Sequence, residues 1–242
     1  MVKRLLDLVL AGMALVVAAP LLAFAAVGIS LSSPGPVLYR AVRVGRGGRL
    51  FEMYKLRTMH VRPGDGAGST ITARHDPRVF PFGGWLRRTK IDELPQLVNV
   101  LRGEMSIIGP RPEDPQFVAA HYAPVHHETL DVRPGLASPG SLYSTTHGES
   151  RLRPEQAERD YVERLLPLKL ALDVVYVRRA SPLYDAALIV RTLGILAGRL
   201  AGRRTFPEPP EMAAARQLLE PRAPAALPAP SPAARKGPVL VL

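Results

Sequence analysis

The feature that most constrains this 242-residue chain is an uncharged stretch of 24 residues from Leu8 to Leu31. A helix of that length is long enough to cross the hydrocarbon core of a bilayer. A secretory signal peptide would also begin with basic residues such as Lys3 and Arg4. Its apolar region, however, is only about 7–15 residues long. The run is too long for that class, so we expect the segment to stay in the membrane.

The charges on either side of this run bear on how it enters the membrane. Lys3 and Arg4 precede it, and four arginines follow between positions 40 and 49. A simple span has one flank that is poor in Lys and Arg. Pro20 lies near the middle of the run, where it removes a backbone hydrogen bond and kinks a helix. We therefore predict a re-entrant helix over residues 1–33 with both ends in the cytoplasm, and a straight span is the alternative.

The composition limits the partners of the chain. Its formal net charge is +11, which implies a polyanionic partner such as nucleic acid, an anionic membrane surface or a phosphorylated substrate. The sequence has no cysteine, which excludes disulfides and thiolate zinc sites. A reducing, cytoplasmic setting fits this absence.

The remainder of the chain predicts an α+β domain over residues 34–204. Strand-forming residues on both sides of the GRGG turn (45–48) predict a small β-hairpin. This turn lacks the spacing of a phosphate-binding loop, so we interpret it as a turn only. Several amphipathic helices are predicted downstream, and the apolar segment 181–200 is expected at the membrane interface. The Pro/Ala-rich segment 205–242 is predicted to be a disordered tail.

Two adjacent carboxylates, Asp92 and Glu93, stand at the start of a predicted helix. Pro95 is tolerated only in the first turn, so the helix should begin between Ile91 and Glu93. Thr89 and Asp92 then fit a capping box, and the helix dipole favours an anion at this end. One interpretation is therefore that Asp92 only caps the helix and that Glu93 is an ordinary N-terminal helix acid.

The neighbouring cations favour a catalytic interpretation of the same pair. Phosphoryl transfer needs a nucleophile, a metal and cations on the phosphate oxygens. Asp92 would supply the nucleophilic oxygen beside Arg87, Arg88 and Lys90. Glu93 points about 100° away around a helix and could hold Mg²⁺ through an oxygen ligand. Nearby arginines could clamp phosphate oxygens in bidentate fashion.

Five motifs in a fixed order extend this interpretation, namely KRLLD, SPGPVLYRAVRVGRGGRLFEMYKLRTM, DPRV, IDELPQLVNVLRGEMSIIGPRP and RPGL. Together they resemble the bacterial sugar transferases called monotopic phosphoglycosyl transferases, in their small catalytic form, from Lys3 to Arg199. The resemblance implies transfer of a sugar-1-phosphate from a UDP-sugar to undecaprenyl phosphate, with release of UMP. That reaction is the first membrane step in making capsule, exopolysaccharide, lipopolysaccharide or glycoprotein glycans.

The resemblance also assigns roles to individual residues. It implies that Asp92 attacks the sugar-linked phosphorus to form a covalent phosphosugar–aspartate, and that Glu93 helps to hold Mg²⁺. It implies that Pro20 is the break of a re-entrant membrane helix. The phosphate-binding cations that it implies are Lys55, Arg57, Arg88 and Arg111. After RPG, however, the chain reads LASPGSLYSTTHGE, which departs from the usual family pattern and leaves the identity of the sugar open.

These inferences place the protein in the inner (cytoplasmic) membrane with its catalytic domain on the cytoplasmic face. The expected partners are a UDP-sugar, undecaprenyl phosphate and membrane lipid, without nucleic acid, and a homodimer is left open. Two alternatives remain. One is a non-catalytic, membrane-anchored basic protein that binds anionic lipid or nucleic acid through its charge. The other is an inactive partner of a true transferase, against which the intact acidic pair argues.

Overall fold

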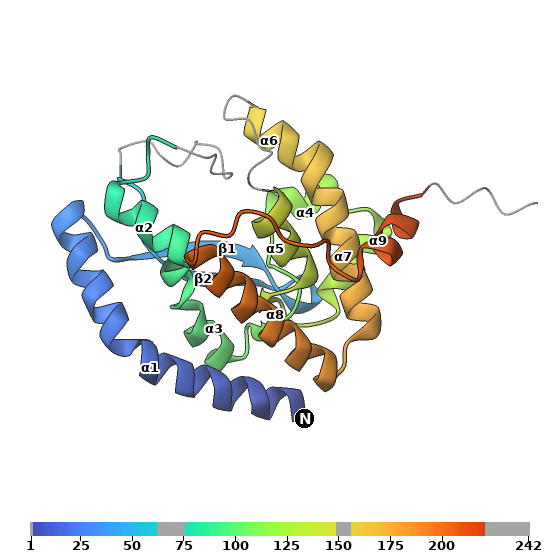
Figure 1. Cartoon of the computed structure of the whole chain (residues 1–242), viewed down its shortest axis with the longest axis horizontal. Coiled ribbons are helices and arrows are strands. Elements are labelled where there is room, and N and C mark those ends of the chain that lie inside the picture. Colours follow the sequence, from blue (N-terminus) through green and yellow to red (C-terminus); the bar gives the residue numbers. More distant parts are fainter. Residues whose placement is uncertain (1, 62–75, 149–155, 221–242) are drawn as a thin grey trace, which may run out of the picture.

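The computed structural model describes residues 2–61, 76–148 and 156–220, which form a mostly helical α+β fold with two small sheets (Figure 1). The strands of these ranges are β1 (Leu38–Val44), β2 (Leu50–Leu56), β3 (Ser106–Ile108) and β4 (Gly135–Ala137). The α-helices are α1 (Val2–Ser32), α2 (Pro81–Thr89), α3 (Gln96–Arg102), α4 (Pro115–His121), α5 (Pro139–Tyr143), α6 (Ala157–Asp160), α7 (Leu166–Arg179), α8 (Pro182–Leu200) and α9 (Met212–Leu219).

The predicted β-hairpin is confirmed. Strands β1 and β2 pair antiparallel, with Ala41 opposite Met53. Gly47 and Gly48 in the turn have φ angles of 66° and 77°, which glycine adopts without the strain that a Cβ would cause. The side chains of Ala41 and Met53 are buried against α1 and α3, so one face of the hairpin contributes to the core.

A second sheet, which the sequence did not predict, joins β3 and β4 in parallel. The two strands lead into and out of a close backbone crossing at Gly109 and Gly135. A Cβ on Gly135 would lie 2.1 Å from the Gly109 nitrogen, so neither backbone leaves room for a side chain there. Three-residue strands carry no usable hydrophobic period, which is why the pattern gave no signal.

Helix α1 follows the edge of the molecule and bends along its length, while the other elements lie to one side of it (Figure 1). Pro20, where the sequence predicts a break, lies inside a helix that continues on both sides of it. Proline removes only the single hydrogen bond to the carbonyl of residue 16, and a bend can accommodate its ring.

One narrow stripe of α1 packs on the rest of the protein. The stripe lies within about 40° around the helix axis, and its buried members are Asp7, Ala11, Ala18, Ala25 and Ile29. Near the N-terminus, Ala11 packs with the hairpin and α3. Near the other end, Ala25 and Ile29 pack with Leu56 and with residues of α2. Both halves of α1 therefore rest on the same body.

The opposite face of α1 is apolar and exposed. Met13, Val16 and Val17 are 63%, 75% and 78% exposed, and on α8 Leu183 is 84% exposed. Within the described ranges, α1 is the helix that is long and apolar enough to cross a membrane by length and composition. Soluble monomers rarely expose such continuous apolar surface, so these faces indicate association with a membrane.

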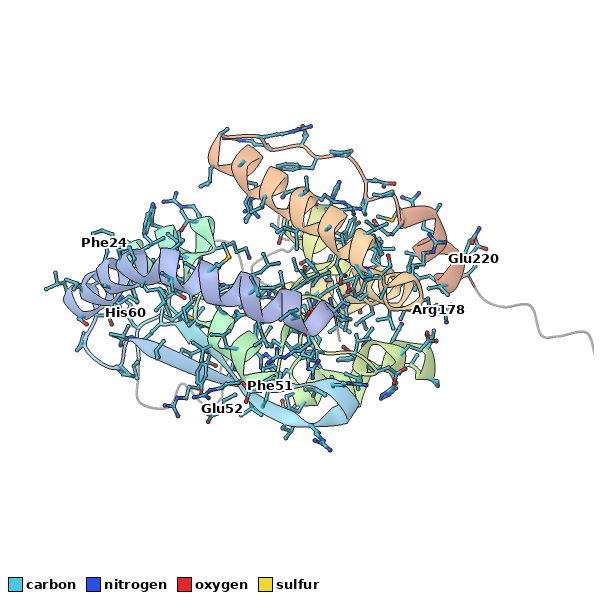
Figure 2. The ribbon with its side chains drawn as sticks, turned by 90° about the horizontal axis from the view of Figure 1, so that it is seen from below. Phe24, Phe51, Glu52, His60, Arg178 and Glu220 are labelled. Atoms are coloured by element: carbon cyan, nitrogen blue, oxygen red, sulfur yellow. The ribbon has the colours of Figure 1, made fainter. Side chains whose placement is uncertain are left out.

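Polar side chains in the first turns of α1 anchor it to three other elements. Lys3 forms an ion pair with Asp185 of α8 at 2.6 Å. Arg4 donates to the carbonyls of Val100 and Leu101 at the end of α3. The buried carboxylate of Asp7 accepts from the Ser106 hydroxyl and from the backbone N–H that follows it. Seen from below in Figure 2, α1 runs between the hairpin, which carries Phe51 and Glu52, and α8.

The predicted disorder of the tail is wrong for residues 205–220. Helix α9 packs on α7, with Met212 and Ala215 buried in a cluster that includes Leu172 and Val175. Just before α9, Glu211 is buried and accepts two hydrogen bonds from Arg191 of α8. The Pro/Ala content hid two buried apolar positions three residues apart. Residues 221–242 lie outside the described residues.

Ending the chain after Pro210 should therefore destabilise it, whereas ending it after Glu220 should not. The shorter form loses the buried Met212 side chain, worth about 2–5 kcal/mol, and leaves Arg191 without its buried carboxylate. We expect a melting temperature several degrees lower in detergent for the form that ends at Pro210. Equal melting temperatures for the two truncations would contradict the packing of α9.

Candidate active site

The acidic pair lies in a tight turn between two helices, rather than at the start of one. Helix α2 ends at Thr89, Ile91–Glu93 form a single 3₁₀ turn, and α3 begins after Pro95. The predicted capping box is wrong because Thr89 belongs to the preceding helix. Its hydroxyl lies 3.0 Å from the carbonyl oxygen of Trp85, one turn back.

Lys90 makes the turn between the two helices with an unusual backbone conformation. Its φ angle is 60°, and it is the only non-glycine residue with positive φ in the described ranges. The left-handed conformation costs a non-glycine residue about 1–2 kcal/mol. The turn places the Lys90 ammonium 3.8 Å from Glu93 Oε1. Strain of this kind is typical of functional sites, where geometry matters more than local stability.

Glu93 is the centre of a cluster of cations from separate parts of the chain. Arg111, in the loop after β3, donates to both carboxylate oxygens, at 2.6 and 3.1 Å. Lys55, near the end of β2, lies 3.6 Å from Oε1. The parallel β3–β4 pair and the crossing at Gly109 hold the Arg111 loop in place. Tertiary structure thus joins groups that lie up to 56 residues apart in sequence, from Lys55 to Arg111.

The environment drives the two carboxylates in opposite directions. Burial favours the neutral form of Glu93, but Arg111, Lys90 and Lys55 outweigh it and hold its pKa well below the usual range. Burial and the charge on Glu93 instead raise the pKa of Asp92. Burial also lowers the pKa of Lys55 to about 8, although Glu93 opposes this shift. Paired titratable groups whose pKa values are driven apart in this way are typical of catalytic sites.

Asp92 is buried but incompletely paired. Its side chain belongs to a residue that is 6% exposed, and its Oδ1 atom has no hydrogen-bond partner among the described residues. The charges of Lys55, Lys90 and Arg87 favour its ionised form. A buried carboxylate oxygen without a partner, held near three cations, is suited to attack an electrophile that brings its own negative charge.

The structure separates the predicted cations into two groups. Lys55 and Arg111 join the acidic pair, whereas Arg57 and Arg88 do not. Arg57 is buried, and its guanidinium donates to the carbonyls of Ser33, Pro34 and Gly35 just after α1. These contacts tie Arg57 to the chain just after α1, and its phosphate contact stays a prediction. Arg88 is exposed on the outer side of α2.

Arg87 and Lys90, rather than Arg88, bring their charges close to Asp92. The sequence contained a signal for this difference, because the buried positions of α2 are Gly83 and Leu86. Arg87, four positions after Gly83, falls on the same helical face, and Lys90 follows in the turn after the helix. Arg88 lies about 100° further around the helix.

A second cluster of charged and polar side chains holds the loop that carries Arg111. Glu113, two residues after Arg111, forms an ion pair with Lys169 of α7 and accepts a hydrogen bond from the Tyr161 hydroxyl at 3.0 Å. Burial opposes the charge on Glu113, but Lys169 outweighs it, and the pKa of Glu113 is lowered. One turn further along α7, Asp173 accepts from the Gly140 N–H at 2.9 Å.

Comparison with known proteins identifies the class. The sequence pattern of the family described as "Bacterial sugar transferase" matches residues 1–199, so the chain belongs to this family. It is 40% identical over 193 residues to the UDP-glucose:undecaprenyl-phosphate glucose-1-phosphate transferase of Caulobacter vibrioides, covering 79% of this chain and 68% of that protein.

Two further relatives show how lengths differ within the family. The exopolysaccharide production protein PSS of Rhizobium leguminosarum bv. phaseoli is 35% identical over 196 residues, which cover 92% of it. The UDP-glucose:undecaprenyl-phosphate glucose-1-phosphate transferase of Escherichia coli K12 is 34% identical, but the match covers only 39% of that protein. The chain thus spans nearly all of one relative and under half of another.

The unfolding free energy of the protein should depend on pH through the buried carboxyl group of Asp173. Burial raises its pKa to about 6, a shift that Lys169, Ser138 and the Gly140 N–H only partly oppose. Between its ordinary pKa of about 4 and this value, the folded state holds a proton that the unfolded state has released. The contribution of Asp173 to the unfolding free energy therefore falls as pH rises through this window.

Asp173→Asn removes this titration while keeping a side-chain oxygen for Gly140. Between pH 4 and pH 7, the unfolding free energy of the variant should rise relative to the wild type by about 2 kcal/mol, as measured by denaturant unfolding in detergent. Asp131→Asn, at an exposed acid, should show no such trend. A difference between Asp173→Asn and wild type that does not depend on pH would contradict the shifted pKa.

Proposed function

We propose that this protein transfers a sugar-1-phosphate from a UDP-sugar to undecaprenyl phosphate, releasing UMP, and so begins the synthesis of a surface polysaccharide. The main support is the convergence of Lys55, Lys90 and Arg111 on the Asp92–Glu93 turn. The relatives from Caulobacter and Escherichia coli, both named as UDP-glucose:undecaprenyl-phosphate glucose-1-phosphate transferases, support the choice of substrates.

The proposed reaction has two chemical steps, with Asp92 as the nucleophile. An Asp92 oxygen attacks the phosphorus that bears the sugar, and the bond from that phosphorus to the bridging oxygen breaks, so that UMP leaves. A phosphate oxygen of undecaprenyl phosphate then attacks the same phosphorus and releases the aspartate. The carboxylate is regenerated, and two difficult substrates are handled in turn at one site.

The cations offset the electrostatic repulsion between the two anions in this reaction. A carboxylate and a diphosphate repel each other, so the attack needs positive charge on the phosphate oxygens. Lys55 and Lys90 lie nearest to the turn, and Arg111 keeps further N–H donors beyond the two that bind Glu93. Binding of the substrate phosphates would place these cations between the two anions.

The carboxylates present fit a Mg²⁺ ion that is shared with the substrate. No cluster of three or more acidic or histidine ligands occurs in the described ranges, so a cage made only of protein ligands is not formed. Mg²⁺ usually takes one or two carboxylates and completes its shell with phosphates and water. We propose Glu93 as its carboxylate ligand, because its pKa is held low and it is ionised. Bound there, Mg²⁺ would neutralise charge on the diphosphate.

We also propose that α1 re-enters the cytoplasmic face of the inner membrane and leaves on the same side. Lys3 near one end and Ile29 near the other both contact the same globular body. A straight span would carry one of these ends across the bilayer, away from that body. The apolar outer faces of α1 and α8 would instead rest in the lipid, where the site can receive undecaprenyl phosphate from the bilayer and UDP-sugar from the cytoplasm.

Asp92→Asn should abolish both UMP release and the covalent phosphosugar–aspartate adduct. Wild-type protein incubated with a radiolabelled UDP-sugar, without lipid acceptor, should retain label after denaturation. Glu93→Gln should reduce turnover severely because the ionised metal ligand is lost, and Asp131→Asn should behave as wild type. Initial rates with both substrates varied should give parallel double-reciprocal lines.

Intersecting lines without a trappable adduct would indicate direct attack by the lipid phosphate. If the protein releases no UMP at all, the inactive-partner alternative would be favoured.

The topology can be tested with single cysteines, because the native sequence has none. Val2→Cys and Gly47→Cys should both resist a membrane-impermeant maleimide in intact spheroplasts and react after lysis. Val17→Cys, on the exposed apolar face, should stay unreactive in lysed membranes and react after solubilisation in detergent. Labelling of only one of the first two sites in intact spheroplasts would show that α1 crosses the bilayer.

A further inference from the structure

Gln96, the first residue of α3, has no visible structural reason to be polar. It is completely buried, and neither its Oε1 nor its Nε2 atom has a hydrogen-bond partner among the described residues. Buried polar side chains are almost always paired. An unpaired buried amide destabilises the fold relative to one whose hydrogen bonds are made. A residue of this kind indicates a partner that arrives with function.

The only other unpaired side-chain atoms in the described core are Asp92 Oδ1 and Arg57 Nε. Asp92 precedes Gln96 by four residues, and the two residues between Glu93 and Gln96 have right-handed helical angles. Residues four apart on such a backbone are separated by little more than one turn. The free amide and the free carboxylate oxygen are therefore both buried, about one turn apart, in this short segment.

Strand β2 lies against this segment, and Asn99, three residues after Gln96, shows how the segment is fixed. Asn99 donates to the Glu52 carbonyl at 2.7 Å and accepts from the Tyr54 N–H at 3.0 Å. The Asn99 amide thereby makes the two backbone hydrogen bonds that a neighbouring strand would make with β2. Gln96 lies between Asp92 and this anchor in the sequence, and Lys55, the β2 residue that follows Tyr54, lies 3.6 Å from Glu93 Oε1.

We propose that Gln96 is a positioning residue for Asp92, and this proposal rests on the nucleophilic role of Asp92 proposed above. When substrate is bound, the Gln96 amide donates a hydrogen bond to Asp92 Oδ1 and fixes the plane of the carboxylate. The second carboxylate oxygen is then aimed at the phosphorus. Such hydrogen bonds are often long or absent in unliganded sites and tighten only in the reacting complex.

An amide suits this task better than a cation would. A lysine or arginine bonded to Oδ1 would withdraw charge from the nucleophile, whereas a neutral N–H orients the carboxylate and leaves its charge in place. Orientation matters because attack on phosphorus is in line with the leaving oxygen. A misplacement of about 1 Å can reduce a rate about 100-fold.

The alternative is a structural role, in which Gln96 bonds to the edge of β2 as Asn99 does. Gln96→Met tells the two apart, because methionine has a similar shape without polar atoms. If Gln96 is unpaired in the resting protein, the variant should have an unchanged or higher melting temperature. If Gln96 is structural, the variant should melt at a lower temperature, as Asn99→Leu should.

The decisive measurement is the single-turnover rate of UMP release by the full-length protein with a saturating UDP-sugar and no lipid acceptor. Gln96→Met should lower this rate about 100-fold while leaving the KM for UDP-sugar in steady-state assays unchanged. Gln116→Met, at an exposed glutamine, should match the wild type in both. If Gln96→Met does not fold, Gln96→Leu is measured in its place.

A rate equal to that of wild type, or a loss confined to KM, would overturn the proposal, whatever the melting temperature. The same assay keeps the two proposals apart. If the wild-type protein releases no UMP without the lipid, the covalent mechanism fails. If the wild type forms the adduct and the Gln96 variant forms it equally fast, only the role of Gln96 fails.

Discussion

The partly buried ion pair between Glu93 and Arg111 is the interaction on which the site depends. A carboxylate that is largely removed from water is tolerated only when it is paired and hydrogen-bonded, so the turn that carries Glu93 and the loop that carries Arg111 must meet. The β3–β4 pair fixes the loop, and the buried Glu113–Lys169 pair ties it to α7. Removing any of these supports would leave a buried charge without its partner.

Helix α1 gives this polar centre its place at a membrane surface. One side of the helix carries mostly small side chains that pack closely on the body, and the other side carries large apolar side chains. Its first turns also hold α3 and β3, the elements on either side of the site, through Arg4 and Asp7. The segment that associates with lipid therefore also fixes the catalytic framework, which suits an enzyme that takes one substrate from water and another from the bilayer.

The site departs from ordinary folding rules at three neighbouring positions. Lys90 has a strained backbone, and Asp92 and Gln96 keep buried polar atoms unpaired. Natural proteins accept such departures where function requires them and compensate elsewhere. Here the well-packed stripe of α1 and the Asn99 contacts to β2 lie beside them. The same segment is locally unfavourable and firmly held, as the nucleophilic role proposed for Asp92 requires.

The sequence by itself determined the local features of this protein. The alternating residues and glycine turn specify the hairpin, the uncharged run specifies α1, and the motif around Asp92 and Glu93 specifies the family. Tertiary structure alone decided which cations reach the acids, since Arg57 turns to backbone carbonyls and Arg111 arrives from a distant loop. It also decided that α9 packs and that α1 continues through Pro20. Periodicity and turn chemistry act between near neighbours, whereas burial and charge pairing depend on contacts that only the folded chain creates.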